Sequence, residues 1–232
     1  MMRSRFVDLS EATAGDAVVV IDVLRAFTTV PWALHLGARR ILAVTSAEEA
    51  WALHDIHVPD ALVAGEDAGR IIDGFDLGNS PSELTREVID GRTIIHRTSA
   101  GTQGLSRTAG SRLVLAASFV TASATARALV AAGAQDVTYV ITGASHGRDG
   151  DEDLACAEFI DAVARGEAPD PAPFVARVAT SDAGRMFAPG GADWAPPRDL
   201  ELACEIDRFD VHLEARADER LGAVEVTCVG GR

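Results

Sequence analysis

The fold is decided by the stretch Val18-Val19-Val20-Ile21-Asp22-Val23-Leu24-Arg25-Ala26-Phe27-Thr28-Thr29. It begins as a run of apolar, β-branched residues, which is typical of a strand buried on both faces. From Phe27 onward the apolar residues recur at helical spacing. We therefore predict a strand over 17–23 and a helix over 27–37, with Asp22 and Arg25 at their junction.

A charge at the end of a buried strand is costly unless it is paired or binds something. Ligands in open α/β sheets also bind at that place. Two interpretations follow from these facts. Either Asp22 caps the turn and Arg25 pairs with it, or both side chains belong to a ligand site.

Strand and helix patterns alternate along the rest of the chain. Further strands are predicted at 40–44, 61–64, 92–96, 112–116 and 136–141, with helices at 46–54, from 80, after 102, at 120–132 and at 151–165. Residues 1–16 are polar and are expected to be peripheral. Beyond 166 we expect two short helices near 174–188 and 198–206, then a hairpin over about 208–214 and 222–229. The alternation predicts an α/β fold with a largely parallel or mixed sheet and helices on both faces.

A weak internal repeat occurs at an offset of 96 residues. Val18 then matches Val114, and Gly37 matches Gly133 at a helix end. The same offset sets Ser118 opposite Asp22, so two helix N-termini are expected near one cleft. We interpret residues 1–232 as one α/β domain with repeat halves of about 17–90 and 92–165 and a C-terminal extension over 166–232.

Composition limits the partners and the compartment. The formal net charge of −14 disfavours nucleic acid and anionic membrane surfaces, and an anionic substrate would need local positive charge at its site. Three scattered cysteines argue against a disulfide framework or a zinc site and favour a reducing, cytoplasmic location. We expect no signal peptide or membrane span, and the sequence leaves a homo-oligomer open. The histidines show no metal-ligand spacing, so His96 and His146 are expected to be structural.

Two loops after predicted strands carry groups suited to an anion. Gly74 to Pro81 contains two glycines that let backbone approach a ligand, and it leads into a helix start at Ser80. Arg97-Thr98-Ser99-Ala100-Gly101-Thr102 combines hydroxyl groups, a glycine and a guanidinium before another helix. Each loop also has a simpler interpretation as a capped turn.

Two further loops carry carboxylates. Glu66 directly follows a strand and is a candidate metal ligand, or else part of an exposed turn. Four carboxylates lie between Asp149 and Asp153 at a helix start. The helix dipole accounts for part of this cluster, and a hard divalent cation with oxygen ligands accounts for the rest. Carboxylates, arginines and free N–H groups together suit phosphoryl transfer to water.

These motifs resemble those of the 2-phosphosulfolactate phosphatase (ComB) family. The resemblance runs from about residue 17 to 165 and rests on the stretches 20–26, 65–66, 74–81 and 101–102 and on Gly150 with Glu152-Asp153. It implies a three-layer α/β/α fold with an internal duplication. It also implies a Mg²⁺-dependent phosphoric monoester hydrolase that converts 2-phosphosulfolactate to sulfolactate and phosphate, a step of coenzyme M biosynthesis.

The resemblance also implies site residues. The acidic ones are Asp22, Glu66, Glu152 and Asp153; the anion contacts are Arg25, Asn79, Ser80, Gly101, Thr102 and Ser118, to which the loop pattern adds Arg97 and Ser99. We expect Asp22, Glu66 and Asp153 to hold the metal, with Asp22, Arg25, Glu152 and Asp153 acting in catalysis. Either a carboxylate, Asp22 first among them, or a water activated by the metal attacks phosphorus.

One segment departs from the family pattern. The family carries a Thr-Thr-Thr-Asn-Gly-Thr type segment where this chain has Arg97-Thr98-Ser99-Ala100-Gly101-Thr102. Ala100 removes a polar contact, and Arg97 adds a positive charge for an anion. Two alternatives therefore stay open: a phosphatase for another small phosphorylated hydroxy acid, or a non-catalytic protein that binds an anionic metabolite.

Overall fold

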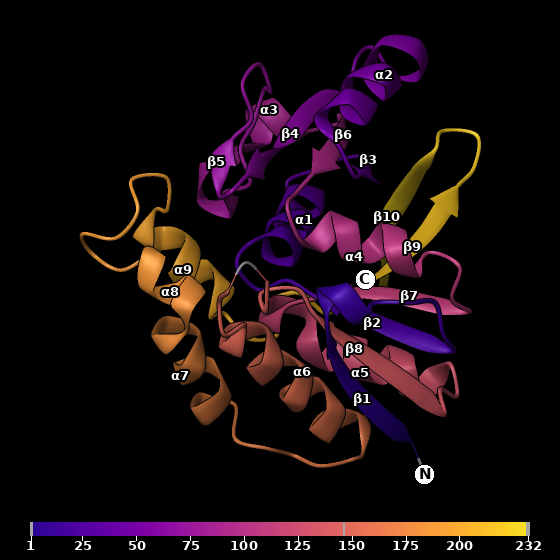
Figure 1. Cartoon of the computed structure of the whole chain (residues 1–232), viewed down its shortest axis with the longest axis vertical. Coiled ribbons are helices and arrows are strands. Elements are labelled where there is room, and N and C mark those ends of the chain that lie inside the picture. The colour runs from indigo at the N-terminus through magenta and orange to yellow at the C-terminus, as the bar shows by residue number, and fades with distance from the viewer. Residues whose placement is uncertain (1, 146, 231–232) are drawn as a thin grey trace.

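The computed structural model describes residues 2–145 and 147–230, and His146 lies outside this range. Within it, one mixed sheet of ten strands is covered by helices on both faces (Figure 1). The predicted three-layer α/β/α fold is confirmed. The strands are β1 (Arg3–Asp8), β2 (Ala17–Ile21), β3 (Arg40–Val44), β4 (Leu62–Asp67), β5 (Arg70–Ile71), β6 (Thr93–Arg97), β7 (Leu113–Ala117), β8 (Asp136–Ile141), β9 (Val211–Asp218) and β10 (Ala223–Gly230).

The helices connect these strands largely as the sequence pattern predicts, except that the single helix expected near 174–188 is two helices separated at Ser181. They are α1 (Ala26–His35), α2 (Ala47–His57), α3 (Arg86–Ile89), α4 (Gly101–Thr108), α5 (Ala122–Ala131), α6 (Asp151–Ala164), α7 (Ala172–Thr180), α8 (Asp182–Met186) and α9 (Pro197–Ala203). Helix α2 begins as expected, because Ser46 Oγ accepts a hydrogen bond from the Glu49 N–H at 3.1 Å.

The sheet consists of two parallel groups joined by an antiparallel hairpin. Its order is β1-β8-β2-β7-β9-β10-β3-β6-β4-β5. Strands β1, β8, β2 and β7 are mutually parallel, and so are β3, β6 and β4. The hairpin β9–β10 pairs antiparallel with β7 on one side and with β3 on the other. The last segment of the chain therefore lies in the middle of the sheet (Figure 1).

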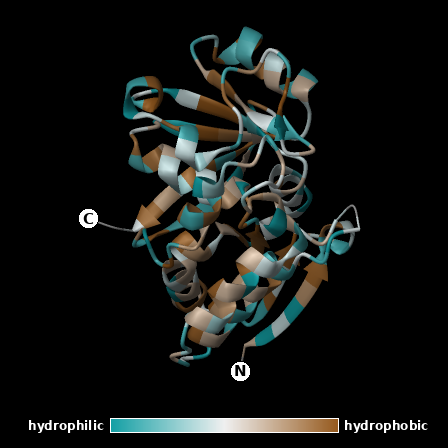
Figure 2. Ribbon diagram, turned by 90° about the vertical axis from the view of Figure 1, so that its left-hand side faces the viewer, coloured by the Kyte–Doolittle hydropathy of each residue, from teal (hydrophilic) through white to brown (hydrophobic). Residues whose placement is uncertain are grey.

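Helices α1 and α4 lie where they pack against both parallel groups. One apolar cluster contains Phe27 of α1 and Leu105 of α4 together with Val20 of β2 and Ile94 of β6. On the other face, α5 and α6 cover the β2 group and α2 covers the β3 group. Figure 2 shows the hydrophobic residues on the strands and on the inward sides of the helices. This packing fixes the ends of β2 and β6 relative to each other.

The structure corrects two expectations about local structure. Residues 1–16 are not merely peripheral, because Arg3–Asp8 forms an edge strand parallel to β8. The start at Ser80 opens only a 3-10 turn, Pro81–Glu83, and the Ser80 side chain does not cap it. The reason is a competing acceptor for the Ser80 hydroxyl, described below.

The 96-residue offset appears directly in the sheet. Strands β2 and β7 are neighbours, and their parallel register pairs Val18 with Val114. The Asp22 N–H donates to Ala117 O at 3.2 Å, so Asp22 and Ser118 end adjacent strands. The repeat halves themselves stay a prediction.

Candidate functional site

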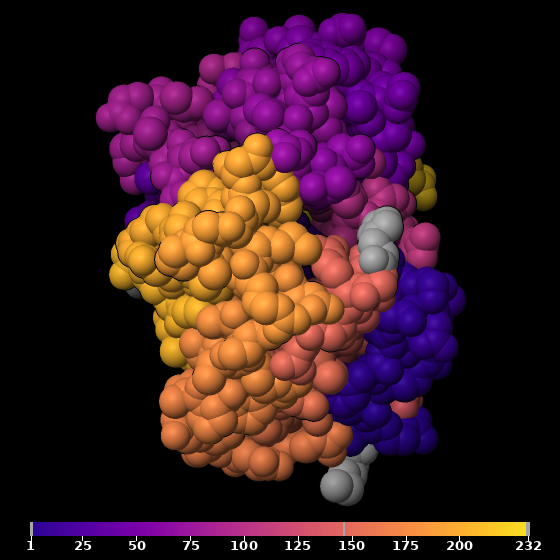
Figure 3. Space-filling view, turned by 60° about the vertical axis from the view of Figure 1, so that its left-hand side comes forward, coloured from indigo at the N-terminus to yellow at the C-terminus, as the bar shows by residue number. Residues whose placement is uncertain are grey.

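A cleft of about 510 Å³ opens where β2, β4 and β6 end. The residues that line it come from these strand ends, from the loops 72–80 and 143–150, and from the C-terminal segment, by which we mean the extension 166–232; they are Asp22, Leu24, Arg25, Glu66, Asp67, Ala68, Gly69, Asn79, Arg97, Ser99, Ala100, Arg148, Met186 and Trp194. In Figure 3 the orange C-terminal segment packs directly against the purple residues of the β3 group. The volume is typical of a small-molecule site.

Asp22 lines this cleft and has one carboxylate oxygen without a partner among the described residues. Its Oδ1 accepts a hydrogen bond from the Ala26 N–H at 3.0 Å, so it does cap the turn into α1. No described residue donates to Oδ2, and the residue is 6% exposed. Burial, with the negative charge of Glu66 nearby, raises the pKa of Asp22 to about 7. The carboxyl group can therefore hold or release a proton near neutral pH.

Glu152 and Asp153 lie in the first turn of α6, are both buried and, unlike Asp22, are not among the residues that line the cleft. Asp153 accepts N–H bonds from Val23 at 2.8 Å and Gly143 at 2.7 Å, which ties the ends of β2 and β8 together. Glu152 Oε2 is buried without a hydrogen-bond partner among the described residues. Burial raises the pKa of Glu152, and burial with the charges of Glu152 and Asp22 raises that of Asp153. These carboxyls repel one another when ionised.

Glu66 organises the loops on the opposite wall of the cleft. Its Oε1 accepts from the Ser99 N–H at 2.6 Å, and its Oε2 accepts from the Gly69 N–H at 2.7 Å and from Ser99 Oγ at 3.1 Å. Both carboxylate oxygens therefore already have donors. The Ser99 hydroxyl, expected to meet substrate, is engaged here.

The carboxylates do not form a ready-made cage for a metal. Among the described residues, no three His, Cys, Asp or Glu side chains are arranged to hold one. Two oxygens nevertheless lack partners within the described part of the chain, Asp22 Oδ2 and Glu152 Oε2. Mg²⁺ is usually bound by one or two carboxylates, with waters and substrate phosphate completing its shell. The unpaired oxygens and the crowded negative charge fit such a cation.

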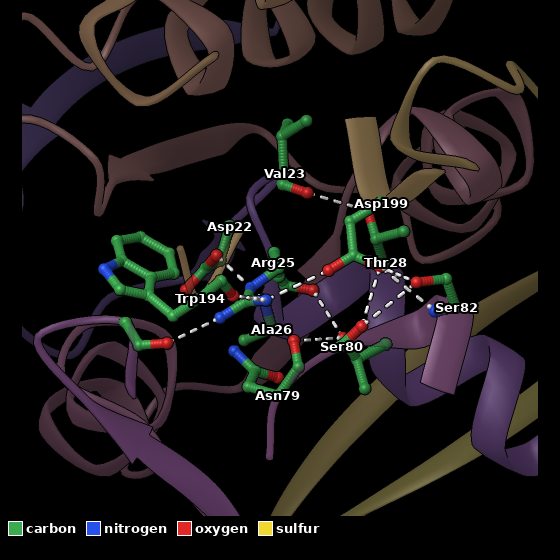
Figure 4. Close-up of polar contacts among 12 residues, drawn as sticks. Asp22, Val23, Arg25, Ala26, Thr28, Asn79, Ser80, Ser82, Trp194 and Asp199 are labelled. Carbon is green, nitrogen blue, oxygen red and sulfur yellow. Dashed lines mark hydrogen bonds and ion pairs between the residues drawn. The ribbon is translucent and has the colours of Figure 1, made fainter. Parts of the chain in front are cut away.

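Arg25 lies in the cleft wall but does not pair with Asp22. Its guanidinium is 5% exposed and forms an ion pair with Asp199 at 3.0 Å (Figure 4). Its Nη2 donates to Gly69 O at 2.8 Å. The first interpretation of the opening stretch is thus half right: Asp22 caps the turn, and a residue far along the chain pairs with Arg25.

Arg97 lines the cleft with part of its guanidinium unpaired among the described residues. Its Nη1 donates to Glu66 O at 2.6 Å and contacts the exposed Asp67 carboxylate at 3.2 Å. Its Nε is buried without a partner among the described residues. A buried unpaired donor on a cation that lines a cleft favours an anionic ligand.

Asn79 presents an amide to the same cleft. Its Oδ1 lies 3.1 Å from His96 Nε2, so a neutral His96 that carries its proton on Nε2 donates to it. Burial lowers the pKa of His96 to about 4, which keeps the ring neutral at physiological pH. The Asn79 NH₂ group is then free to donate to a ligand, and His96 is structural, as expected.

Besides Gly101, three residues expected to contact the anion, Ser80, Thr102 and Ser118, do not line the cleft. Ser80 Oγ donates to Asp199 at 2.8 Å. Thr102 Oγ1 exchanges hydrogen bonds with the backbone of Thr98. Ser118 is fully buried and donates to Phe27 O at 2.8 Å. Their hydroxyl groups hold the walls together, and the second helix start at the cleft is that of α4.

Gly101 supports the Asp22 carboxylate by having no side chain. A Cβ at this position would lie 2.7 Å from Asp22 Oδ2 and 2.9 Å from Ala26 Cβ. The close packing of α4 against the β2–α1 junction therefore requires glycine.

We expect Gly101→Ala to lower activity about a hundredfold, because the added methyl group must displace the Asp22 carboxylate. The measurement is the steady-state turnover rate of the purified variant. Gly110→Ala is the matched control, since its Cβ would meet only Ala14 Cβ at 3.7 Å. Equal activities of the two variants would contradict this role of Gly101.

Sequence reasoning missed four residues of the site. Arg148 lines the cleft, and its positive charge offsets part of the rise in the pKa of Asp22, but the sequence pattern of its loop indicates only a carboxylate cluster. Met186, Trp194 and Asp199 come from the C-terminal segment. Asp199 follows Pro196-Pro197-Arg198 and looks like an ordinary acid in a first helical turn. No local signal indicates that it reaches Arg25.

Comparison with known proteins gives one consistent family. The sequence model of the 2-phosphosulpholactate phosphatase family matches residues 5–187. A protein of Deinococcus radiodurans described as a probable 2-phosphosulfolactate phosphatase is 39% identical over 160 residues, which is 68% of this chain and 66% of that protein. Proteins of Bacillus subtilis and Synechococcus sp. strain RCC307 with the same description are 37% and 39% identical over 65% of this chain.

The aligned region spans 62 to 66% of the length of these relatives. The described cysteines are free thiols, and no described helix has the length and apolarity to cross a membrane. The matched residues include β2, the cleft loops and the start of α6. The chain belongs to the 2-phosphosulpholactate phosphatase family.

Proposed function

We propose that this protein is a Mg²⁺-dependent phosphoric monoester hydrolase that converts 2-phosphosulfolactate to sulfolactate and phosphate. The observation that carries the proposal is the pairing of unused groups in one cleft. A carboxylate oxygen of Asp22 and a guanidinium N–H of Arg97, both without a partner among the described residues, belong to side chains that line the same cavity. The Asp22 oxygen is suited to attack on phosphorus, and the Arg97 N–H is suited to donate a hydrogen bond to a phosphate oxygen.

Arg97, Arg148 and the Asn79 amide supply the local positive and donor groups that a net charge of −14 makes necessary. In the proposed reaction the bond between phosphorus and the hydroxy-acid oxygen breaks, and that oxygen takes a proton. Either Asp22 Oδ2 attacks phosphorus and water then hydrolyses the aspartyl phosphate, or Asp22 orients the attacking water. Its pKa of about 7 allows proton transfer in the second route.

Asp22 and Glu152 would hold the Mg²⁺, which supplies charge neutralisation of the phosphoryl group. Glu66 and Asp153, whose oxygens already accept N–H bonds, would then fix the surrounding loops. The proposal also includes a place in coenzyme M biosynthesis and a cytoplasmic location. The family supports the place in coenzyme M biosynthesis, and the scattered cysteines support the cytoplasmic location.

A second substrate is favoured by one observation. Ala100 lines the cleft at the position where the resemblance implies an asparagine. The substrate of this chain would then be another small phosphorylated hydroxy acid, because one polar contact to the organic group is missing. The phosphoryl end of the site is the same in both cases.

A panel of phosphomonoesters assayed with Mg²⁺ tests the proposal. We expect 2-phosphosulfolactate to give the highest kcat/KM, EDTA to abolish phosphate release, and added Mg²⁺ to restore it. Release from another phosphorylated hydroxy acid alone would select the second substrate. Stabilisation by inorganic phosphate without release from any ester would indicate a binding protein instead.

A further inference from the structure

Arg25 and Asp199 form a buried ion pair between two distant parts of the chain. Arg25 follows β2, whereas Asp199 lies in the first turn of α9, beyond the residues that match the family model. The two side chains are 5% and 0% exposed, and Arg25 Nη1 lies 3.0 Å from Asp199 Oδ2. Burying such a pair costs solvation, so its geometry must be fixed by further contacts.

Asp199 is held firmly from the side away from Arg25. Its Oδ1 accepts from Ser80 Oγ at 2.8 Å, from the Ser82 N–H at 3.1 Å and from Ser82 Oγ at 2.6 Å (Figure 4). Every contact in this set comes from the turn that follows the Asn79 loop. The Asp199 carboxylate is therefore held in a single orientation, and its ion pair with Arg25 fixes the orientation of the guanidinium.

The rest of the guanidinium is fixed by backbone and rings. Arg25 Nη2 donates to Gly69 O at 2.8 Å, and Nη1 also contacts Trp194 O at 3.4 Å. The rings of Phe187 and Trp194 lie 5.3 Å and 5.2 Å from the guanidinium carbon. No described residue accepts a hydrogen bond from Arg25 Nε, although Arg25 lines the cleft.

We propose that Asp199 is a positioning residue that holds Arg25 so that its unused N–H groups meet an oxygen of the anionic substrate. The inference rests on the proposed function, since it concerns the same cleft. Ser80 and Ser82 then act one step further back, by fixing Asp199. Without the Asp199 charge, Arg25 keeps its position against Gly69 less well and binds the anion more weakly.

A double-mutant cycle separates positioning from simple support of the fold. Asp199→Asn keeps the size of the side chain and removes its charge; Arg25→Met removes the group on which it acts. We expect Asp199→Asn to raise KM for the best phosphomonoester about tenfold with a smaller change in kcat. In the Arg25→Met background the same substitution should change KM no further. Additive effects, or a lower Tm with unchanged KM, would overturn the inference.

Two more variants keep the test decisive. Ser82→Ala removes one donor to Asp199 without stranding a buried charge, and it should raise KM in the same direction by a smaller factor. An unchanged KM in this variant contradicts the proposal even where Asp199→Asn fails to fold. Arg198→Gln is the control, because it breaks an exposed ion pair with Glu201 in the same helix and should leave KM unchanged.

Binding of inorganic phosphate, measured by calorimetry on the same variants, distinguishes failure of the proposed function from failure of the Asp199 inference. If the wild-type protein releases no phosphate from any ester, the proposed function fails. The Asp199 inference still holds if Asp199→Asn weakens phosphate binding about tenfold only when Arg25 is present. It fails if the weakening is independent of Arg25.

Discussion

Asp22→Asn abolishes turnover: we expect kcat to fall by about 10³-fold or more. Asparagine keeps the Oδ1 cap on the Ala26 N–H, so the turn into α1 survives. It replaces the unpaired Oδ2 with an amide that neither attacks phosphorus nor accepts a proton. The result is the same for both routes, since each needs this carboxylate. Phosphate release under saturating substrate and Mg²⁺ measures the effect.

The same variant should be more stable than the wild-type protein at alkaline pH. The pKa of Asp22 is about 7 in the folded protein, above the ordinary value of 3.8. The folded state therefore binds the proton more tightly than the unfolded chain. This contribution to stability is complete below about pH 4 and is lost as the pH rises through about 7. An asparagine side chain stays neutral and avoids the loss, so Tm should rise by several degrees at pH 8 and little at pH 4.

Asp73→Asn is the control, because Asp73 is exposed on the loop between Gly69 and Asn79 and does not line the cleft. It should leave kcat and Tm unchanged. Near wild-type activity of Asp22→Asn would remove Asp22 from the centre of the mechanism. An inactive variant with a lowered Tm at pH 8 would mean that the loss comes from damage to the fold.

Arg97→Met should lower kcat/KM by about a hundredfold or more. Methionine keeps much of the apolar stem and removes the buried Nε–H that has no partner among the described residues. The hydrogen bond to Glu66 O is also lost. Because the overall charge repels an anion, the loss of one local cation should raise KM strongly and also weaken inhibition by inorganic phosphate.

Steady-state kinetics and phosphate inhibition at two salt concentrations measure this effect. Arg86→Met is the matched control, since the Arg86 side chain is 58% exposed and pairs loosely with Asp90 at 3.8 Å. It should leave both constants unchanged. If Arg97→Met leaves KM and phosphate inhibition intact, Arg97 is a structural link between β6 and the Glu66 loop, and Arg148 becomes the cation to test.

The sequence predicted those parts of the molecule that depend on local pattern. The buried run 17–23 and the helical spacing after it indicated the β2–α1 unit, because burial on both faces selects apolar residues at every position. The 96-residue offset set Ser118 opposite Asp22, and the structure shows that these residues end the adjacent strands β2 and β7. Asp22, Glu66, Arg97 and Ser99 were singled out because polar groups after buried strands are costly unless they have a purpose, and Asn79 was implied by the resemblance to the family.

Other outcomes depended on competition for hydrogen-bonding groups. Ser80, Thr102 and Ser118 lie just after strands or at a helix start, as the cleft residues do, yet their hydroxyl groups are used within the walls. A sequence shows that a donor exists but not which acceptor lies nearest to it. The edge strand Arg3–Asp8 was missed for a similar reason, because its pattern is half polar and only pairing with β8 makes it a strand.

The sequence alone thus determined the α/β architecture and the family, and it predicted the strand ends at which the candidate site lies, because each follows from residue types at fixed spacing. Only the tertiary structure decided the partner of Arg25. Asp199 lies 174 residues away, and its approach depends on how the C-terminal segment folds back over the cleft. The opening stretch explains why Arg25 needs a partner, since a buried charge must be neutralised, but packing chose which carboxylate supplies it.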